Sequence, residues 1–418
     1  MDFLNNLPIN FNFDIFGWLE TMATSPWKAA WVLFCSGGWI LFVWVFAWGI
    51  WHIWLGNRRG NFARAQRYYM LALHLPKQTE QSPKAVENMF SHLSGLYRGL
   101  TMKEALWEGQ LQTTLSLEIV SIEGHIKYFI RVGEKFRDLV EATIFSQYPD
   151  AEIIETVDYA KDFPQIYPDE KYDMWGSEFV PKKPAAFPFK TFSFFEHNPS
   201  KEYFKDPMAS FLEFLSKLKK GENLWIQFLV QPTTDDWKKS CEMEIDKITG
   251  KFKVGAKPED MFKMLSMTPA ERQMVEQMQM KISKGGFLVK IRIVYVAEKQ
   301  VFRKGPMIGA MKGAFSQYNG LNEFKTYKYI TPKTDYFWQK NKIFEYLSAG
   351  FYKTWHTRQN RLMRAYKHRD MWWGGPMFVL NAEELATIYH FPMTEVKAPL
   401  MQKTESKKGE PPAALPTE

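Results

Sequence analysis

The sequence contains very little cysteine: Cys35 and Cys241 are the only two among 418 residues. Two cysteines cannot build the disulfide framework of a small secreted domain, and they cannot form a cysteine metal site. This composition excludes the disulfide-rich class of secreted protein and suits a chain that works in a reducing cytosol.

The motifs of several enzyme classes are also missing. No stretch matches the glycine-rich phosphate loop, because Gly250 and Lys251 lack both the upstream glycine and the following hydroxyl residue. Neither a His-Glu-x-x-His zinc pair nor a Gly-x-Ser-x-Gly nucleophile turn occurs, and eight histidines are scattered without a cluster. We therefore predict that the chain is not an enzyme, with no catalytic residue, no metal site and no cofactor.

Charged residues are absent from residues 29–55, a run of 27 positions without Asp, Glu, Lys or Arg. Crossing a bilayer takes about 20 apolar residues, whereas the buried helices of soluble proteins are usually shorter and keep a polar face. Tryptophans gather at both ends of the run, where indole rings favour the headgroup region. The pattern predicts one transmembrane helix at 29–55, preceded by an extracytoplasmic leader at 1–28.

The charges around this run predict its orientation. Arg58, Arg59, Arg64 and Arg67 follow it directly, whereas the preceding segment offers a single lysine, Lys28. Positive charge stays on the cytoplasmic side. We expect a single-pass membrane protein with its amino terminus outside, its bulk in the cytoplasm and the lipid bilayer as a partner.

The region after the arginines shows the order strand, helix, strand, strand, helix, strand twice. This is the pattern of the ferredoxin-like βαββαβ unit. The first unit has its elements at 68–75, 83–100, 114–122, 125–132, 134–148 and 151–157, and the second at 190–196, 207–219, 224–230, 287–297, 301–317 and 323–330. The predicted fold class is α+β: a transmembrane helix, two tandem ferredoxin-like units and a carboxyl-terminal helical region.

The domain boundaries follow from proline, charge and composition. We expect the first unit at 60–160, a linker at 161–188, the second unit at 189–334 with a helical insertion at 235–285, a helical region at 335–396 and a disordered tail at 397–418.

The helical region carries six basic residues without an acidic one between them, which are Lys353, Arg358, Arg361, Arg364, Lys367 and Arg369. They are candidates for contact with DNA phosphate, lipid or an acidic protein surface, and a solvated face without a partner is the alternative. Further on, Asn381 and Glu384 have the spacing of a structural helix cap, and Pro392 marks the end of that helix.

Five stretches together resemble the membrane-anchored amino-terminal modules of bacterial conjugation and type IV secretion ATPases, of the kind found in small-genome uncultivated bacteria. These are residues 73–81 (LHLPKQTEQ), 118–132, 136–152 (FRDLVEATIFSQYPDAE), 224–232 (LWIQFLVQP) and 380–392. In relatives that carry the motor, a tail like residues 405–416 leads into the ATPase domain, whereas this chain stops at Glu418. The resemblance implies a motor supplied in trans and a location in the bacterial cytoplasmic (inner) membrane.

On that basis we expect a platform that docks a hexameric motor ATPase at the membrane and forms a homo-oligomer in the assembly, with DNA that it guides as a further candidate partner. Three alternatives stay open: a secretion-channel scaffold with its large domain outside the cytoplasm, a stand-alone membrane-attached nucleic-acid binder, and an enzyme with an unrecognised site in a ferredoxin-like sheet.

Overall fold

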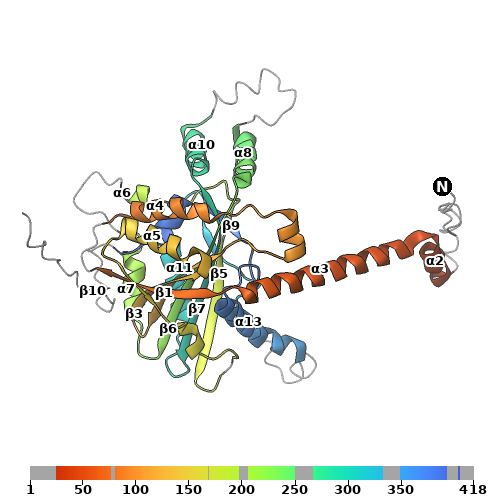
Figure 1. The fold of residues 1–418 in the computed structure, drawn as a ribbon, viewed down its shortest axis with the longest axis horizontal. Helices are drawn as coiled ribbons and strands as arrows, with labels where there is room; N and C mark the ends of the chain where they lie inside the picture. The colour runs from red at the N-terminus through yellow and green to blue at the C-terminus, as the bar shows by residue number, and fades with distance from the viewer. Residues whose placement is uncertain are drawn as a thin grey trace, which may run out of the picture. The chain divides into compact units, whose positions relative to one another are not determined.

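The structure is a computed structural model of the 418-residue chain, and Figure 1 shows its ribbon. It describes residues 25–76, 81–167, 169–196, 206–249, 267–332, 349–392 and 403–404. Most of the predicted leader and most of the predicted disordered tail lie outside these residues. The chain divides into two compact units, the first made of Met1–Gln66 with Gly99–Leu111 and the second of Arg67–Arg98 with Gln112–Glu418.

The first unit is built on an apolar helix. Its elements are α2 (Pro26–Leu33), the helical turn η1 (Phe34–Gly38), α3 (Trp39–Ala65) and a second turn, η3 (Lys103–Glu108). Among the described residues, α3 is the one helix long and apolar enough to cross a membrane. The predicted span at 29–55 is interrupted, because Gly37 has a φ of 118° and breaks the helix before α3 begins.

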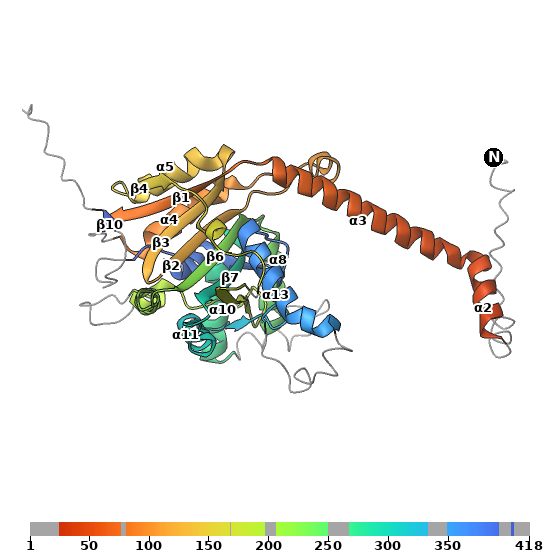
Figure 2. The ribbon, with the colours of Figure 1, turned by 90° about the horizontal axis from the view of Figure 1, so that it is seen from below.

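The second unit is built on one ten-stranded sheet, whose strands can be followed in Figure 2. The strands are β1 (Tyr68–Pro76), β2 (Leu115–Ile122), β3 (His125–Gly133), β4 (Glu152–Glu155), β5 (Tyr172–Pro181), β6 (Glu222–Pro232), β7 (Gly286–Glu298), β8 (Phe324–Thr326), β9 (Phe378–Asn381) and β10 (Lys403–Thr404). The main path is β10-β1-β3-β2-β6-β7-β5-β8, with β4 also paired to β1 and β9 to β7. The two residues of β10 fall within the predicted disordered tail and pair with β1.

The same arrangement of strands occurs twice along this path. The first four strands lie in the order β4-β1-β3-β2 and the next four in the order β8-β5-β7-β6, and β2 joins β6 in antiparallel register. Helices α4 (Pro83–Leu93) and α5 (Arg137–Gln147) connect strands of the first set, and α7 (Ala209–Ser216) and α11 (Lys304–Ser316) connect strands of the second. Each set therefore runs strand, helix, strand, strand, helix, strand.

Two predicted segments differ from the structure. The predicted linker at 161–188 contains β5, a full member of the sheet. The predicted strand at 190–196 is wrong, since its second part forms the short helix α6 (Phe192–Glu196). Aromatic residues at 192, 194 and 195 are typical of a strand, but this segment packs against the helix at Ala382–Ile388, where the Phe192 amide donates to Thr387 Oγ1 at 2.9 Å.

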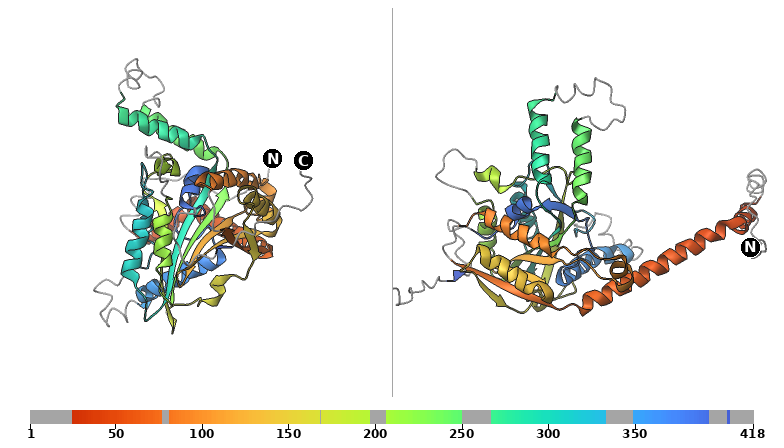
Figure 3. Two further views of the ribbon diagram at one scale, coloured as in Figure 1. Left: turned by 90° about the vertical axis from the view of Figure 1, so that its left-hand side faces the viewer. Right: turned by 45° about the horizontal axis from the view of Figure 1, so that its top comes forward.

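Two helices, α8 (Asp236–Thr249) and α10 (Pro269–Ile282), lie between β6 and β7, where the sequence predicts a helical insertion. They stand side by side in Figure 3, and a small apolar cluster joins them. Trp237, Cys241 and Ile245 of α8 pack there with Val275 and Met278 of α10.

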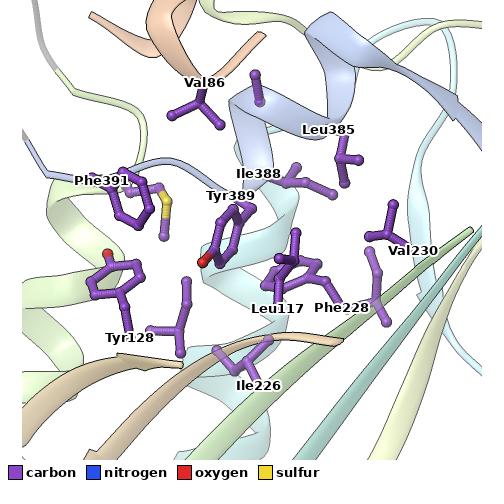
Figure 4. Close-up of a cluster of buried hydrophobic side chains, with 14 of the residues drawn as sticks. Val86, Leu117, Tyr128, Ile226, Phe228, Val230, Leu385, Ile388, Tyr389 and Phe391 are labelled. Atoms are coloured by element: carbon purple, nitrogen blue, oxygen red, sulfur yellow. The ribbon is translucent and has the colours of Figure 1, made fainter. Parts of the chain in front are cut away.

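Both faces of the sheet are covered. The larger core packs α4, α5, α7, α11 and the short helix α14 (Ala382–Ile388) against alternate residues of the strands. Figure 4 shows its centre, where Leu385, Ile388 and Tyr389 point toward Leu117 and Phe228 of the sheet. The opposite face is covered by α13 (Ala349–His368) and by the turn η5 (Tyr159–Asp162). The predicted helical region at 335–396 contains α13, the short strand β9 and α14, and residues 333–348 lie outside the described part.

Candidate interaction surface at helix α13

A row of polar side chains crosses the sheet beneath α13. Glu118 of β2, Gln227 of β6, Arg292 of β7 and Glu178 of β5 are successive partners in the strand register, and none of the four is exposed. The Gln227 amide donates to Glu118 Oε1 at 3.0 Å and accepts from Arg292 Nη1 at 3.1 Å. Arg292 also donates to Glu178 Oε1 through Nε at 3.0 Å and Nη2 at 2.7 Å. The row is thus continuous across four strands.

The carboxyl-terminal end of α13 is bonded to this row. Arg292 Nη1 donates to the carbonyl of Ala365 at 3.0 Å, and Gln227 Nε2 donates to the carbonyl of Tyr366 at 3.1 Å. The last carbonyls of a helix lack partners within it, and cations are favourable at that end because of the helix dipole. The row therefore stabilises the end of α13 both by hydrogen bonds and by charge.

Arg369 closes the arrangement from the helix side. Its Nε donates to Glu118 Oε1 at 2.9 Å and its Nη2 to Glu118 Oε2 at 3.1 Å, and the same guanidinium pairs with Asp158. The Tyr159 hydroxyl donates to Glu118 Oε2 at 2.7 Å and lies 2.5 Å from the hydroxyl of Tyr366. Glu118 is therefore saturated with donors.

These contacts keep both partners charged. Burial opposes ionisation of Glu118, but the attraction of Arg369 and the hydrogen bonds from Arg369, Ser116 and Tyr159 outweigh it and lower the pKa of Glu118 to about 2. Burial alone would lower the pKa of Arg369, yet its attraction to Glu118 and its bonds to Asp158 hold that pKa well above the usual value. A paired buried charge of this kind is strongly destabilising when one partner is removed.

The face of α13 turned away from the sheet carries part of the predicted basic set. Arg361 and Arg364 are exposed, and Arg358 is half-buried with its guanidinium 3.5 Å from the carbonyl of Thr331. Lys367 is half-buried and donates to the carbonyl of Phe163 at 2.6 Å. The side chain of Lys353 lies outside the described part of the structure.

Arg369 does not belong to this exposed face, contrary to its place in the predicted contact set. Its side chain is 2% exposed and is used inside the protein, because Glu118 and Asp158 neutralise it there. The surface that α13 offers is therefore a shorter stripe, which we call the α13 stripe, made of Arg358, Arg361, Arg364 and the exposed His368.

Two aromatic side chains stand exposed in neighbouring loops of the same unit. Tyr329 is 62% exposed and Trp372 is 58% exposed. The ammonium group of Lys328 lies 5.0 Å from the centre of the Tyr329 ring. Basic groups interleaved with exposed aromatics are typical of surfaces that bind single-stranded nucleic acid. An exposed carboxylate, Asp162, lies close enough to act on the charge of Lys367, so the field around the stripe is not uniformly positive.

The predicted cap of α14 is confirmed. The Asn381 side chain accepts from the amide of Glu384 at 2.8 Å, and Glu384 Oε2 accepts from the amide of Asn381 at 3.1 Å. Glu384 also forms a buried ion pair with Lys281 of α10, 2.9 Å between Nζ and Oε2. Glu384, which the sequence predicts only as part of a helix cap, thus also joins α14 to α10.

A pocket of about 350 Å³ lies beside this cap. Its wall is mostly apolar and includes Phe189, Phe194 and Met280. The charged groups in its wall are already paired, Glu384 with Lys281 and Glu383 with Lys284 at 2.6 Å. Its volume is in the range of small-molecule sites, but the charged groups that could orient a ligand are used in these ion pairs.

The four orientation residues lie at the end of the first unit and the start of the second. Arg58, Arg59 and Arg64 belong to the last turns of α3, and Arg67 precedes β1. Arg58 lies over the ring of Trp54, 5.4 Å from its centre. In the part of the chain that the structure describes, no three His, Cys, Asp or Glu side chains gather where a metal ion would be held. The membrane orientation and the absence of a cofactor stay predictions.

The buried row was missed by reasoning from the sequence. Its signal was present, because Glu118, Gln227 and Arg292 each stand near the middle of a strand that is mostly apolar. A charged residue in such a strand predicts a buried partner. The sequence does not reveal which partner, since Arg369 lies 251 residues from Glu118.

Residues 74–404 match the family described as a domain of unknown function (DUF8128). The match covers most of the chain, so this protein belongs to that family. No curated protein matches the sequence. The family description names no activity. The feature that points to a function is the α13 stripe on the second unit, which we call the sheet domain.

Proposed function

We propose that this protein is a membrane-anchored, non-enzymatic platform that docks a separately encoded motor ATPase at the cytoplasmic face of a bacterial inner membrane. The apolar helix α3 supports the anchoring, and so do the three arginines in its last turns, which follow its apolar stretch. The kind of partner comes from the resemblance to type IV secretion and conjugation modules. In this proposal the sheet domain is the scaffold and the motor is held on its surface.

In the same proposal, the sheet consists of two ferredoxin-like units side by side. The support is the repeated connectivity with the strand orders β4-β1-β3-β2 and β8-β5-β7-β6. Joining the units through β2 and β6 makes one continuous sheet, and β6 is buried along its whole length. Such a sheet is a rigid base for surface helices.

The observation that carries the proposal is the way α13 is held. One side of this helix is fixed to the sheet by the buried row and by Arg369, while Arg361 and Arg364 project on the other side. Surface lysines and arginines that serve only solubility do not require a helix fixed by buried ion pairs. A fixed basic stripe matches an acidic surface of a protein partner, because complementary charge sets register and speeds association.

DNA is the second candidate partner for the same stripe. The exposed rings of Tyr329 and Trp372 favour it, since bases stack on such rings. A nucleic-acid complex that relies on these charges would weaken steeply as salt rises.

Charge reversal tests the proposal. The variant Arg361→Glu/Arg364→Glu is compared with Lys217→Glu/Lys239→Glu, which reverses two exposed lysines elsewhere in the same unit, one at the C-cap of α7 and one on α8. The tagged full chain is purified in mild detergent from its own cells, and co-purifying proteins are quantified by mass spectrometry. We expect a motor ATPase with wild type and with the control, and its loss with the arginine variant.

The same variants are titrated with single-stranded and duplex DNA by fluorescence anisotropy over a series of salt concentrations. Salt-dependent DNA binding that needs Arg361 and Arg364, without any ATPase, would favour the stand-alone nucleic-acid binder. If neither the ATPase nor DNA depends on the two arginines, the platform proposal for this stripe is wrong.

Orientation is tested by labelling with a membrane-impermeant maleimide. Cys241 is a poor reporter because its side chain is only 1% exposed, whereas Lys239 on the same helix has a side chain that is 77% exposed. We expect Lys239→Cys, in a background without the two native cysteines, to react in lysed but not in intact spheroplasts. Reaction in intact spheroplasts would favour the scaffold whose large domain lies outside the cytoplasm.

A further inference from the structure

The first unit includes a short turn that comes from a distant part of the sequence. Gly99–Leu111 groups with the apolar helix α3 rather than with the sheet. Within it, Thr101 and Glu104 form a reciprocal cap: the Thr101 amide and hydroxyl both donate to Glu104 Oε2 at 2.9 Å, and the Glu104 amide donates to Thr101 Oγ1 at 3.3 Å. The turn is therefore locally defined, despite its short length.

Two contacts hold this turn against α3. The ring of Trp107 lies 5.4 Å from the ring of Trp54, measured between their centres. The backbone of Gly109 lies directly against the backbone of α3. A Cβ at this position would lie only 2.7 Å from the carbonyl carbon of Arg58. Gly109 also has a φ of 71°, so its conformation and its close approach both require glycine.

The turn presents apolar side chains outward. Met102 is 79% exposed and Trp107 is 60% exposed. Trp54 links the turn to α3, since its ring lies 5.4 Å from that of Trp107 and 5.3 Å from that of the exposed Trp51, so the three rings form one apolar surface. In a soluble setting this surface would be costly, since exposed apolar patches mark a site of contact with a partner or a membrane.

The position of the turn along α3 identifies that partner. Trp39 and Trp54 are about 22 Å apart along the axis at about 1.5 Å per residue, and the charged Arg58 follows one turn later. Trp54 therefore lies near the end of the apolar stretch, where indole rings favour the headgroup region. Because the two ring centres are 5.4 Å apart, the depth of Trp107 differs from that of Trp54 by no more than this distance, whatever the tilt of the helix.

We infer that the turn formed by residues 101–109 is a second membrane contact, which inserts Met102 and Trp107 at the level of the lipid headgroups beside α3. The charges nearby suit this depth, since Lys103 belongs to the turn and Arg58, Arg59 and Arg64 follow Trp54 on α3, so basic residues lie beside the proposed headgroup level, where lipid phosphates are found. Glu104 is used by its cap, and Glu108 accepts from the Gln110 amide at 2.7 Å. The turn and α3 together make a two-point attachment, which limits rotation of the anchor about its own axis.

This inference rests on the membrane anchoring proposed above, so its test reports on both. The full chain, with Cys35→Ser and Cys241→Ser, receives one new cysteine labelled with the environment-sensitive dye NBD. The three positions compared are Met102→Cys in the turn, Trp48→Cys in the apolar part of α3, and Lys239→Cys on the sheet domain. Each protein is reconstituted into vesicles of phosphatidylcholine and phosphatidylglycerol that contain lipids spin-labelled either near the headgroup or deep in the acyl chain.

We expect the label at position 102 to be quenched by the shallow spin label more than by the deep one. The label at position 48 should be quenched by the deep one, and the label at position 239 by neither. Adding Gly109→Ala should reduce quenching at position 102 and leave position 48 unchanged, because the new Cβ pushes the turn off the helix.

Quenching at position 48 without quenching at position 102 would overturn this inference and leave the anchor in place. Absence of quenching at position 48 would overturn the anchoring proposal and this inference with it. Unchanged quenching at position 102 after Gly109→Ala would keep the turn at the membrane but overturn the two-point attachment, because contact with α3 would then not set its depth.

Discussion

Replacing Arg369 by methionine is expected to destabilise the sheet domain severely. The change removes the cation that neutralises Glu118 and Asp158. Glu118, on β2, stays fully buried beneath α13. Breaking a buried ion pair in this way costs about 3–5 kcal/mol, because the remaining charge has no compensation. The surface variant Arg364→Met, on the same helix, should change stability by about 0.5 kcal/mol or less.

Urea unfolding of the full chain in detergent, followed by circular dichroism, measures these values. The variant Glu118→Gln should cost less than Arg369→Met, since Arg369 keeps Asp158 as a partner. The double variant should cost less than the sum of the two, with a coupling energy of roughly 1–3 kcal/mol. Simple additivity, or an Arg369→Met variant as stable as Arg364→Met, would refute the role assigned to the buried row.

The same pair predicts a pH dependence. The pKa of Glu118 is lowered from 4.5 to about 2 in the folded protein, so its contribution to stability is fully present above pH 4.5 and is lost as the pH falls toward 2. The stability difference between wild type and Glu118→Gln should therefore shrink over that window. A difference that stays constant as the pH falls would mean that Glu118 is not held ionised by Arg369.

Two further predictions concern other buried groups. Asn381→Ala should lower the free energy of unfolding by roughly 1–2 kcal/mol, because the reciprocal cap of α14 is lost; an unchanged urea midpoint would contradict this. Burial lowers the pKa of Lys290 to about 8 from its ordinary 10.5, so the unfolded chain binds the extra proton between these values and stability should rise with pH across that window. Lys290→Met should abolish the rise, which the same unfolding assay measures between these pH values.

Local patterns in the sequence predicted most of the first four strands. The hairpin of β2 and β3 is an example: alternating apolar residues flank Glu123 and Gly124, which have φ values of 52° and 89° as tight hairpin turns require. The capping box of α14 was equally readable, because its two residues are three positions apart and act on each other. Turns and caps of this kind can be predicted from the sequence, because the residues that form them lie within a few positions of one another.

The sequence analysis did not predict strand β5, because the residues that bury it come from distant parts of the chain. Its segment contains Gly176 and Glu178, which weaken a strand pattern, and it lies among prolines and charges. In the structure Glu178 faces Arg292, and a Cβ on Gly176 would lie 2.5 Å from Leu362 of α13. Both residues fit a central strand only once β7 and α13 are in place.

The glycines of α11 show how the spacing of small residues can mislead. Gly305, Gly309 and Gly313 share one helical face, a pattern that favours close packing of a helix against a sheet. In the structure they make no such contact, because a Cβ on any of the three would meet nothing within 4 Å. The helix packs through Met307, Met311 and Phe315 instead. Spacing along a helix identifies a face but not what that face contacts.

The predicted basic set shows the same limit at the candidate site. Arg364 and Arg369 are both arginines of one basic helical segment, yet the first is exposed and the second is buried. The difference arises from Glu118 and Asp158, which come from the first half of the chain. The sequence predicted a positive surface on this helix, but it could not separate the charge that holds the helix from the charge that the helix presents.

The difference between the buried and the exposed charges of α13 suggests a role for the buried polar row beneath this helix, although burying charged groups costs free energy. Leu362, Met363 and Tyr366 attach the helix to the sheet by apolar contacts, which lack direction and tolerate rotation or sliding of the helix. Hydrogen bonds from Arg292 and Gln227 to single carbonyls of the last turn tolerate neither. A buried ion pair adds little net stability over an apolar pair of similar size, but it can specify one arrangement among several. In this protein the arrangement it specifies is the one that turns Arg361 and Arg364 outward.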